Sequence, residues 1–240
     1  RCTSSAASDV YKRQEEAYLF QKLIRTGFNT NNVDHCTRLC HASSVAALLE
    51  TIGSGAVTAP FYEVEHSDVI IVIGANPTEN HPVAATFFKN AAKKGSKLIV
   101  MDPRGHSLKK HATHMLQFKP GSDVALLNSI MNVIVEENLF NSEYIKKQTE
   151  GFEKLRKHLM NYSPDIMENE TGIDPELIRE VARLYASTNK GIIFWGMGIS
   201  QHTHGTDNAR CLISLALMTG NVGKRGSGLH PLRGQNNVQG

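Results

Sequence analysis

Two short apolar runs rich in β-branched residues, with a segment of helix length between them, constrain the fold of this chain most strongly. Residues 68–73 (DVIIVI) and 97–101 (KLIVM) are almost continuously apolar and have the length of strands. Residues 83–94 carry the apolar period of a helix and are followed by Gly95. Continuously apolar strands are typical of a parallel sheet that is covered on both faces. The pattern therefore predicts a strand–helix–strand unit with a right-handed crossover.

The rest of the chain also alternates between strand-like and helix-like segments. Two more strands are predicted at residues 115–118 and 191–195. Asp174 and Pro175 suit the start of a helix, because the first can cap it and the second has the required φ angle. The glycine-rich residues 223–240 are predicted to be an irregular loop. Further helices are predicted within residues 15–28 and 121–139, and over residues 43–52, 174–185 and 208–218.

This alternation places the chain in the α/β class, with a Rossmann-like, open, mainly parallel sheet and helices on both of its faces. We expect residues 36–235 to form the ligand-binding α/β domain and residues 15–35 to be a helix and linker of a neighbouring domain. Residues 236–240 would begin a further, truncated domain. Residues 1–14 are small and polar without an apolar period, and we expect a disordered or non-native tail.

Composition excludes some classes of protein. The chain has 240 residues, 40% of them hydrophobic, which suffices for one or two domains with a sizeable core. Its formal net charge is only +3 and its Lys and Arg residues are dispersed, so a nucleic-acid partner is not expected. No apolar run approaches the roughly 20 residues of a membrane span. We therefore expect no direct membrane span and a cytoplasmic location.

Polar or glycine-rich loops follow all four predicted strands. In an open parallel sheet, ligands bind beyond the carboxyl ends of the strands. Asp102 suits recognition of a ribose or base, because a carboxylate accepts hydrogen bonds and repels phosphate. The G-x-G-x-x-G turn is missing after residues 68–73, which disfavours ordinary NAD binding. The Gly, Asn, Asp and Pro residues of these four loops are equally typical of turns that bind no ligand. The candidates are Asn76, Glu79, Asp102, Arg104, Gly121, Asp123, Gly196, Met197 and Gln201.

The pair Cys40–His41 is the sharpest chemical feature. A thiolate is a soft metal ligand, and a histidine can exchange a proton near neutral pH. A buried structural cysteine, a zinc site and a Cys–His nucleophile are the alternatives, although no second ligand pair with zinc spacing accompanies them. Arg233, in a glycine-rich loop, could clamp a carboxylate in bidentate fashion or lie on the surface.

Seven runs, in this order and spacing, carry a resemblance to a known family. From about residue 15 to residue 240 the chain is similar to the formate dehydrogenase branch of the molybdopterin oxidoreductases. The resemblance implies molybdenum or tungsten on two molybdopterin guanine dinucleotides. It also implies a 4Fe-4S cluster in an N-terminal domain outside this chain. The runs are NNVDHCTRLCHASSVA, DVIIVIGANPTENHP, MDPR, GSDVALLN, FWGMGISQ, TGNVGKRGSG and RGQNNVQG.

The resemblance also assigns roles to individual residues. It implies that Cys40 is the metal ligand, in the cysteine form of the enzyme, that His41 is the catalytic histidine and that Arg233 holds formate. The candidates above, together with Gln235, would lie near a guanine dinucleotide. A nitrate reductase-like relative is one alternative, but Met typically follows the ligand cysteine there. The further alternatives are another molybdopterin oxidoreductase and a non-catalytic structural relative.

The resemblance implies partners as well. Formate or CO2 would be the substrate, and the electrons would pass to an iron–sulfur protein, a hydrogenase or an NAD-reducing module. The four-cysteine cluster motif and the C-terminal pterin-binding domain of the family are not found in these 240 residues. We therefore expect the chain to be a fragment that is inactive by itself.

Overall fold

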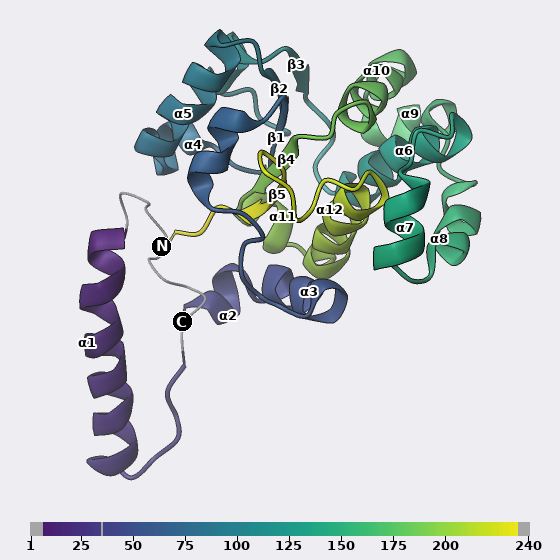
Figure 1. Cartoon of the computed structure of the whole chain (residues 1–240). Coiled ribbons are helices and arrows are strands. Elements are labelled where there is room, and N and C mark those ends of the chain that lie inside the picture. Colours follow the sequence, from purple (N-terminus) through teal and green to yellow (C-terminus); the bar gives the residue numbers. More distant parts are fainter. Residues whose placement is uncertain (1–6, 35, 235–240) are drawn as a thin grey trace.

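One parallel sheet organises the computed structural model, which describes residues 7–34 and 36–234, with side chains from residue 15 onward (Figure 1). Within these residues the sheet has five strands in the order β3-β2-β1-β4-β5. The central strand pairs Ile71 with Ile99 on one side and with Ile193 on the other. The predicted α/β class and the four predicted strands are confirmed. The strands are β1 (Val69–Ile73), β2 (Lys97–Met101), β3 (His114–Leu116), β4 (Gly191–Trp195) and β5 (Gly228–Pro231).

The fifth strand corrects the sequence-based prediction that residues 223–240 form an irregular loop. β5 pairs in parallel with β4, with Leu229 opposite Ile193 and Pro231 opposite Trp195. The segment lacks a strand pattern because it holds Gly228 and Pro231, but a sheet edge tolerates proline. Thr58 accepts a hydrogen bond from the Leu229 N–H at 2.8 Å and so supports the edge. Residues 235–240 lie outside the described part of the chain.

Helices cover both faces of the sheet, as its continuously apolar strands require. Ile71 and Trp195 point to the larger core on one face, and Ile70 and Phe194 point to the smaller core on the other. Because side chains alternate along a strand, each buried strand supplies both cores. The larger core is covered by α3 (Ala42–Ile52), α6 (Asp123–Glu136), α10 (Pro175–Ala186) and α12 (Gly205–Met218), and the smaller by η1 (Phe61–His66), α5 (Pro82–Lys93) and η2 (Ser107–His111).

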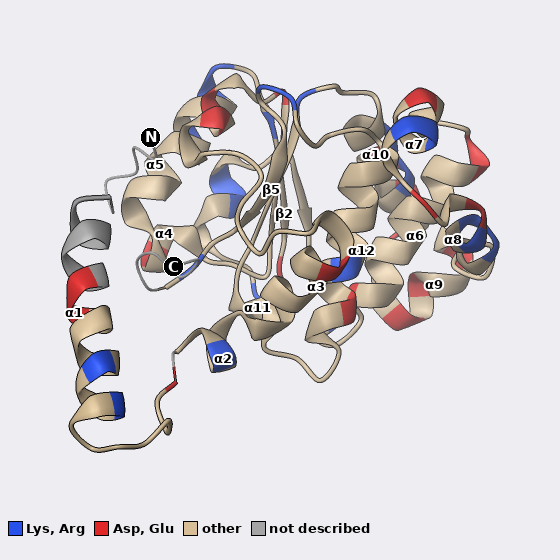
Figure 2. Cartoon of the chain, turned by 60° about the horizontal axis from the view of Figure 1, so that its bottom comes forward, with Lys and Arg blue, Asp and Glu red and all other residues tan. Residues whose placement is uncertain are grey.

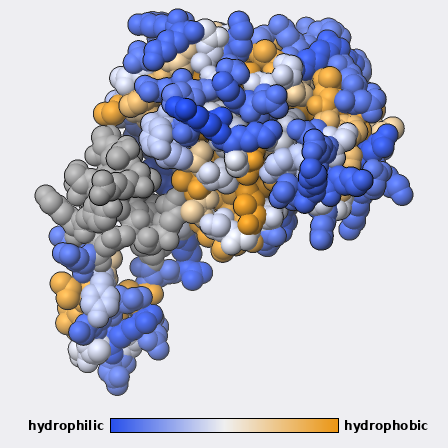
Figure 3. Space-filling model, viewed as in Figure 1, coloured by the Kyte–Doolittle hydropathy of each residue, from blue (hydrophilic) through white to orange (hydrophobic). Residues whose placement is uncertain are grey.

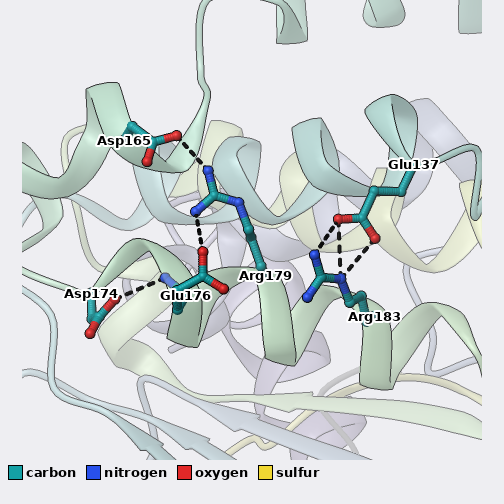
Figure 4. Close-up of polar contacts among 6 residues, drawn as sticks. All are labelled: Glu137, Asp165, Asp174, Glu176, Arg179 and Arg183. Carbon is teal, nitrogen blue, oxygen red and sulfur yellow. Dashed lines mark hydrogen bonds and ion pairs between the residues drawn. The ribbon is translucent and has the colours of Figure 1, made fainter.

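Helix α10 begins at the predicted cap and is joined to neighbouring segments by ion pairs (Figure 4). The Asp174 side chain accepts a hydrogen bond from the Glu176 N–H at 2.8 Å, which confirms the predicted N-cap. Arg179 pairs with both Asp165 and Glu176. The Arg183 guanidinium is bidentate on Glu137, with the shortest N–O distance 2.7 Å. These ion pairs join α10 to neighbouring segments, although exposed pairs contribute little stability each.

The remaining helices lie at the ends of the sheet or away from it. The helix α1 stands apart from the sheet and its covering helices (Figure 1). Its side chains at Tyr18, Leu19 and Phe20 are all about 60% exposed. Figure 3 shows some hydrophobic (orange) surface in the protruding part of the molecule where Figure 1 draws this helix. These helices are α1 (Ala7–Thr26), α2 (Thr37–Cys40), α4 (Pro77–Asn80), α7 (Ser142–Gln148), α8 (Phe152–Leu159), α9 (Pro164–Thr171) and α11 (Met197–Ser200).

The start of α1 differs from the expected tail at residues 1–14. Residues 7–14 are helical, because Ala, Lys, Arg and Gln favour a helix even without an apolar stripe. Residues 1–6 lie outside the described part, and a non-native origin of the segment stays a prediction. Within the described residues, no helix is long and apolar enough to span a bilayer. Lys and Arg are dispersed over separate helices and loops of the described residues (Figure 2).

Candidate functional site

The strand order creates a switch point between β1 and β4. The chain leaves β1 through α5 on one face and leaves β4 through α12 on the other. Because all the strands are parallel, the loops after them meet at a single edge of the sheet. In open sheets of this kind the ligand site lies at that edge, beside the switch point.

Two glycine loops close over the switch point. The Gly198 N–H donates to the Gly74 carbonyl oxygen at 2.9 Å. A Cβ atom on Gly74 would lie 2.9 Å from the Gly198 carbonyl carbon, and Gly74 has a φ of +57°. Both the close approach and the left-handed backbone therefore require glycine here.

Replacing Gly74 with alanine is expected to lower the free energy of unfolding by about 3 kcal/mol or more, since the Cβ strains the backbone and forces the two loops apart. The control is Gly121→Ala, which has a φ of +86° but nothing within 4 Å of its Cβ position. That variant should lose only about 1 kcal/mol. Urea unfolding of both proteins measures the difference, and equal losses would contradict the contact between the loops.

Cys40 lies over the carboxyl end of β4. The Ser200 hydroxyl donates to the Cys40 carbonyl at 2.9 Å, and the Gln201 amide donates to the Leu39 carbonyl at 2.9 Å. Ser43 in turn donates to the Ser200 carbonyl at 2.7 Å. The loop after β4 therefore holds the end of α2 and the start of α3 in place, and Cys40 is only 7% exposed.

His41 is completely buried beside Cys40. Its Nε2 lies 3.1 Å from the Leu232 carbonyl oxygen. A carbonyl can only accept, so Nε2 carries a hydrogen. Burial lowers the pKa of His41 to about 4, and the positive charge of Arg233 adds to the shift. The ring is therefore neutral near pH 7, and Nδ1, which lies 3.4 Å from the Ser200 hydroxyl, keeps its lone pair.

Arg233 follows β5 and extends into the same site. Its Nη2 donates to the Gly55 carbonyl at 2.8 Å, whereas Nε and Nη1 are buried without a hydrogen-bond partner. His81 lies with Nε2 3.0 Å from the Arg233 carbonyl and supports the backbone. Burial lowers the pKa of Arg233 to about 10, and Cys40 opposes this shift. A buried guanidinium with unpaired nitrogens is costly by itself, so an anion is the natural partner.

The structure thus brings Arg233 to the adjacent pair Cys40 and His41, from which it lies far apart in the sequence. Burial raises the pKa of the Cys40 thiol, and Cys36 adds to this shift, while the Gly234 N–H and Arg233 lower the pKa. The thiol is therefore protonated until a cation displaces the proton. Among the described residues, no three His, Cys, Asp or Glu side chains converge on a metal position. Cys40 could therefore hold a metal only with ligands from elsewhere.

Of the other candidates, a second group follows β1, β2 and β3 (Asn76, Glu79, Asp102, Arg104, Gly121 and Asp123), whereas Gly196, Met197 and Gln201 follow β4. Asn76 and Asp102 are buried, and Asp102 accepts a hydrogen bond from the Arg104 N–H at 2.8 Å. Burial raises the pKa of Asp123, which His202 opposes and Asp102 reinforces. Glu79, Arg104, Gly121 and Met197 are exposed, Gly196 is buried, the Gln201 amide is engaged with Leu39, and Gln235 lies outside the described residues.

Ser200 and His81 were not singled out from the sequence, although both help to build the site. Ser200 lies in the GMGISQ run and His81 in the GANPTENHP run, but a lone serine or histidine in a loop gives no signal of its own. A cavity of about 1020 Å³ lies at the opposite edge of the sheet, lined by Val69, Lys97 and Lys190 among others. It contains none of the candidate residues.

The neutral buried histidines predict how stability depends on pH. Burial lowers the pKa of both His41 and His230 from 6.5 to about 4. Below pH 6.5 the unfolded chain takes up protons that the folded protein does not, so the free energy of unfolding falls between pH 6.5 and 4. The loss should be on the order of 3 kcal/mol per histidine. Urea titrations from pH 7 to pH 4 test this, and His41→Gln should flatten the curve. An unchanged slope in His41→Gln would contradict the assignment.

The fold and the site define a class of protein. It is a Rossmann-type α/β protein with a soft thiol, a neutral imidazole and a buried guanidinium over its ligand-binding edge. The chain belongs to the molybdopterin oxidoreductase family, whose model matches residues 6–240. The family prediction is therefore confirmed. Membership implies a cofactor of the molybdopterin type.

Individual relatives are more specific. The chain is 45% identical over 226 residues to the F420-dependent formate dehydrogenase subunit alpha of Methanocaldococcus jannaschii, covering 94% of this chain and 34% of that protein. It is 43% identical to formate dehydrogenase H of Escherichia coli, covering 94% and 32%. The fold matches acetylene hydratase from Pelobacter acetylenicus with a TM-score of 0.73 and 27% identity, over 80% of this chain and 26% of that one. The chain spans about a third of the length of these curated relatives.

Proposed function

We propose that this chain is part of the catalytic subunit of a formate dehydrogenase, which oxidises formate to CO2 by two electrons or catalyses the reverse. The observation that carries the proposal is the convergence of Cys40, His41 and Arg233 at one point of the ligand-binding edge. Formate is a small carboxylate, and Arg233 offers it a positive charge with two buried nitrogens that have no partner among the described residues. The relatives at 43–45% identity are named formate dehydrogenases.

Molybdenum or tungsten on two molybdopterin guanine dinucleotides fits the residues at this edge. Cys40 offers one soft sulfur ligand, and the described residues hold no complete metal site, so the other ligands would be pterin sulfurs. When bound, the metal–pterin group supplies the two-electron acceptor. A 4Fe-4S cluster is proposed for the parent protein outside this chain.

The guanine dinucleotides would be held by the second group of residues. The buried carboxylate of Asp102 can accept from ribose or base donors, and Asp123, Asn76 and Gly121 lie on neighbouring loops. Gly121 has open space at its Cβ position, which permits close approach of a nucleotide to the backbone. Gly196 belongs to the proposed set, and its Cβ position is filled by the loop of Gly74 and Ala75. Glu79, Arg104, Met197, Gln201 and Gln235 complete the proposed set.

Each residue of the first group has its own task. Arg233 binds the carboxylate and fixes its orientation, because a guanidinium donates two parallel hydrogen bonds. His41 is neutral, and its Nε2–H stays on the Leu232 carbonyl, so the ring is held in one orientation beside Cys40 and its Nδ1 lone pair can accept a hydrogen bond. The burial of His41 and Cys40 keeps bulk water from the reacting centre.

Three alternatives share the same fold. The similarity to acetylene hydratase associates this architecture with a protein named for another substrate. A nitrate reductase-like oxidoreductase or a non-catalytic relative would also keep the sheet. Retention of His41 next to Cys40, together with Arg233, favours formate.

The test is made on the full-length parent protein, purified without air. Formate-dependent reduction of a viologen dye is measured together with metal content. Activity with molybdenum or tungsten present is the expected result and identifies the metal. A metal-loaded protein that consumes nitrate but ignores formate would support the nitrate reductase-like alternative. Absence of both metal and activity would support the structural relative.

Partners and location follow from the same proposal. The relatives from Methanocaldococcus and Methanococcus are named as alpha subunits, so we propose that electron-transfer subunits accept the electrons here as well. The electron-accepting subunit would be an iron–sulfur protein, a hydrogenase or an NAD-reducing module. The proposed location is the cytoplasm, and co-purification of the parent protein with its subunits from a soluble extract tests both points.

A further inference from the structure

A second thiol lies against the proposed metal ligand. Cys36 is the N-cap of α2, and Cys40 is its last residue, one helical turn further on. The Cys40 N–H donates to the Cys36 carbonyl at 3.1 Å, so the two residues close one helical turn, and residues four apart on a helix lie on the same side of it. Cys36 is exposed, whereas Cys40 is buried. Of this pair, solvent therefore reaches Cys36 first.

Helix α2 is short enough to tighten for a bond between these two sulfurs. Residues four apart on a helix have Cβ atoms about 5–6 Å apart, whereas a disulfide needs about 3.5–4.5 Å. A contraction of this size would disrupt a long helix. Helix α2, however, has only four residues and ends at His41, whose φ of −133° is not helical. The short turn can therefore tighten at little cost.

The remaining described cysteine, Cys211, lies on another helix than Cys36 and Cys40. Cys211 lies on α12, with its sulfur 3.6 Å from the Asn128 side-chain oxygen. Burial raises its pKa to about 12, so its thiol stays protonated and unreactive. It offers a matched control.

We propose that Cys36 and Cys40 form a reversible disulfide whenever Cys40 is not bound to a metal. Hydrogen peroxide is the oxidant. The Cys36 sulfur attacks one peroxide oxygen, so that an S–O bond forms, the O–O bond breaks, and a sulfenic acid and one water result. The Cys40 sulfur then attacks Cys36; the S–S bond forms, the S–O bond breaks and a second water leaves. Two thiols lose two electrons and two protons, and the peroxide is reduced to two waters.

The disulfide would protect the empty site. It removes Cys40 from further oxidation to sulfinic and sulfonic acids, which are not reversed by a dithiol. A dithiol reductant restores both thiols by exchange. The protective role rests on the proposed function, because it takes Cys40 as the metal ligand, but the disulfide itself does not.

The sequence provides a direct assay. Trypsin cleaves after Arg38, between the two cysteines, and so separates them into the peptides of residues 26–38 and 39–89. The full-length parent protein, produced without molybdenum and tungsten, is treated with hydrogen peroxide, alkylated, denatured and digested without reductant. Mass spectrometry should find the two peptides joined and lighter than their sum by two hydrogens. Dithiothreitol should separate them.

Variants decide whether the pairing is specific. Cys36→Ser should lose the joined peptides and accumulate sulfinic or sulfonic acid at Cys40, whereas Cys211→Ser should retain them. If both peptides of the unmodified protein are recovered unlinked after oxidation, the proposal is overturned. The metal-loaded protein should resist the cross-link. If it cross-links as readily as the metal-free protein, Cys40 is not the metal ligand, so the proposed function fails while the disulfide stands.

Discussion

Cys40→Ala in the metal-loaded parent protein is expected to lower formate oxidation by about a thousandfold or more, which corresponds to about 4 kcal/mol. The variant removes the sulfur that the chain offers at the reacting centre. The metal should be lost to a smaller extent, since the pterin sulfurs would still hold it. Dye-linked activity and metal analysis of the same preparation measure the two effects separately.

The control for this variant is Cys211→Ala. Cys211 is a partly buried thiol on α12 that packs away from the candidate site, so activity should stay within a few-fold of the parent. Normal formate oxidation by Cys40→Ala would remove Cys40 from the reaction. Equal losses in both variants would indicate a general effect of cysteine removal on folding.

Arg233→Ala should act on binding rather than on the chemical step. The Michaelis constant for formate is expected to rise by about a hundredfold, because the loss of a buried charged partner costs about 2–5 kcal/mol. The maximal rate should change far less. Arg233→Lys should fall between, since an ammonium keeps the charge but not the two parallel donors. Steady-state kinetics over a wide range of formate concentrations resolve the two constants.

Arg210→Ala is the matched surface variant. Its guanidinium is paired with Glu50 and Asp207 on the outside of the molecule, so neither constant should change. A fall in the maximal rate of Arg233→Ala with an unchanged Michaelis constant would contradict the binding role. Together, Arg233→Ala and Cys40→Ala separate the group that binds formate from the group at the reacting centre.

Much of the fold follows from local features of the sequence. The apolar runs at β1, β2 and β4 predicted strands because their side chains are buried on both faces. Asp174 and Pro175 predicted the start of α10 because capping is satisfied within one turn. The reactive pair Cys40–His41 was also visible, because its chemistry lies in two adjacent residues.

The tertiary structure decided what depends on distant neighbours. β5 carries no strand pattern and exists because β4 and Thr58 provide hydrogen-bonding partners. The sequence alone could not distinguish a surface Arg233 from a buried one. Only the fold places its unpaired nitrogens near Cys40, and only burial makes His41 neutral. Sequence patterns record local periodicity, whereas burial and charge coupling arise when separate strands deliver their loops to one edge of the sheet.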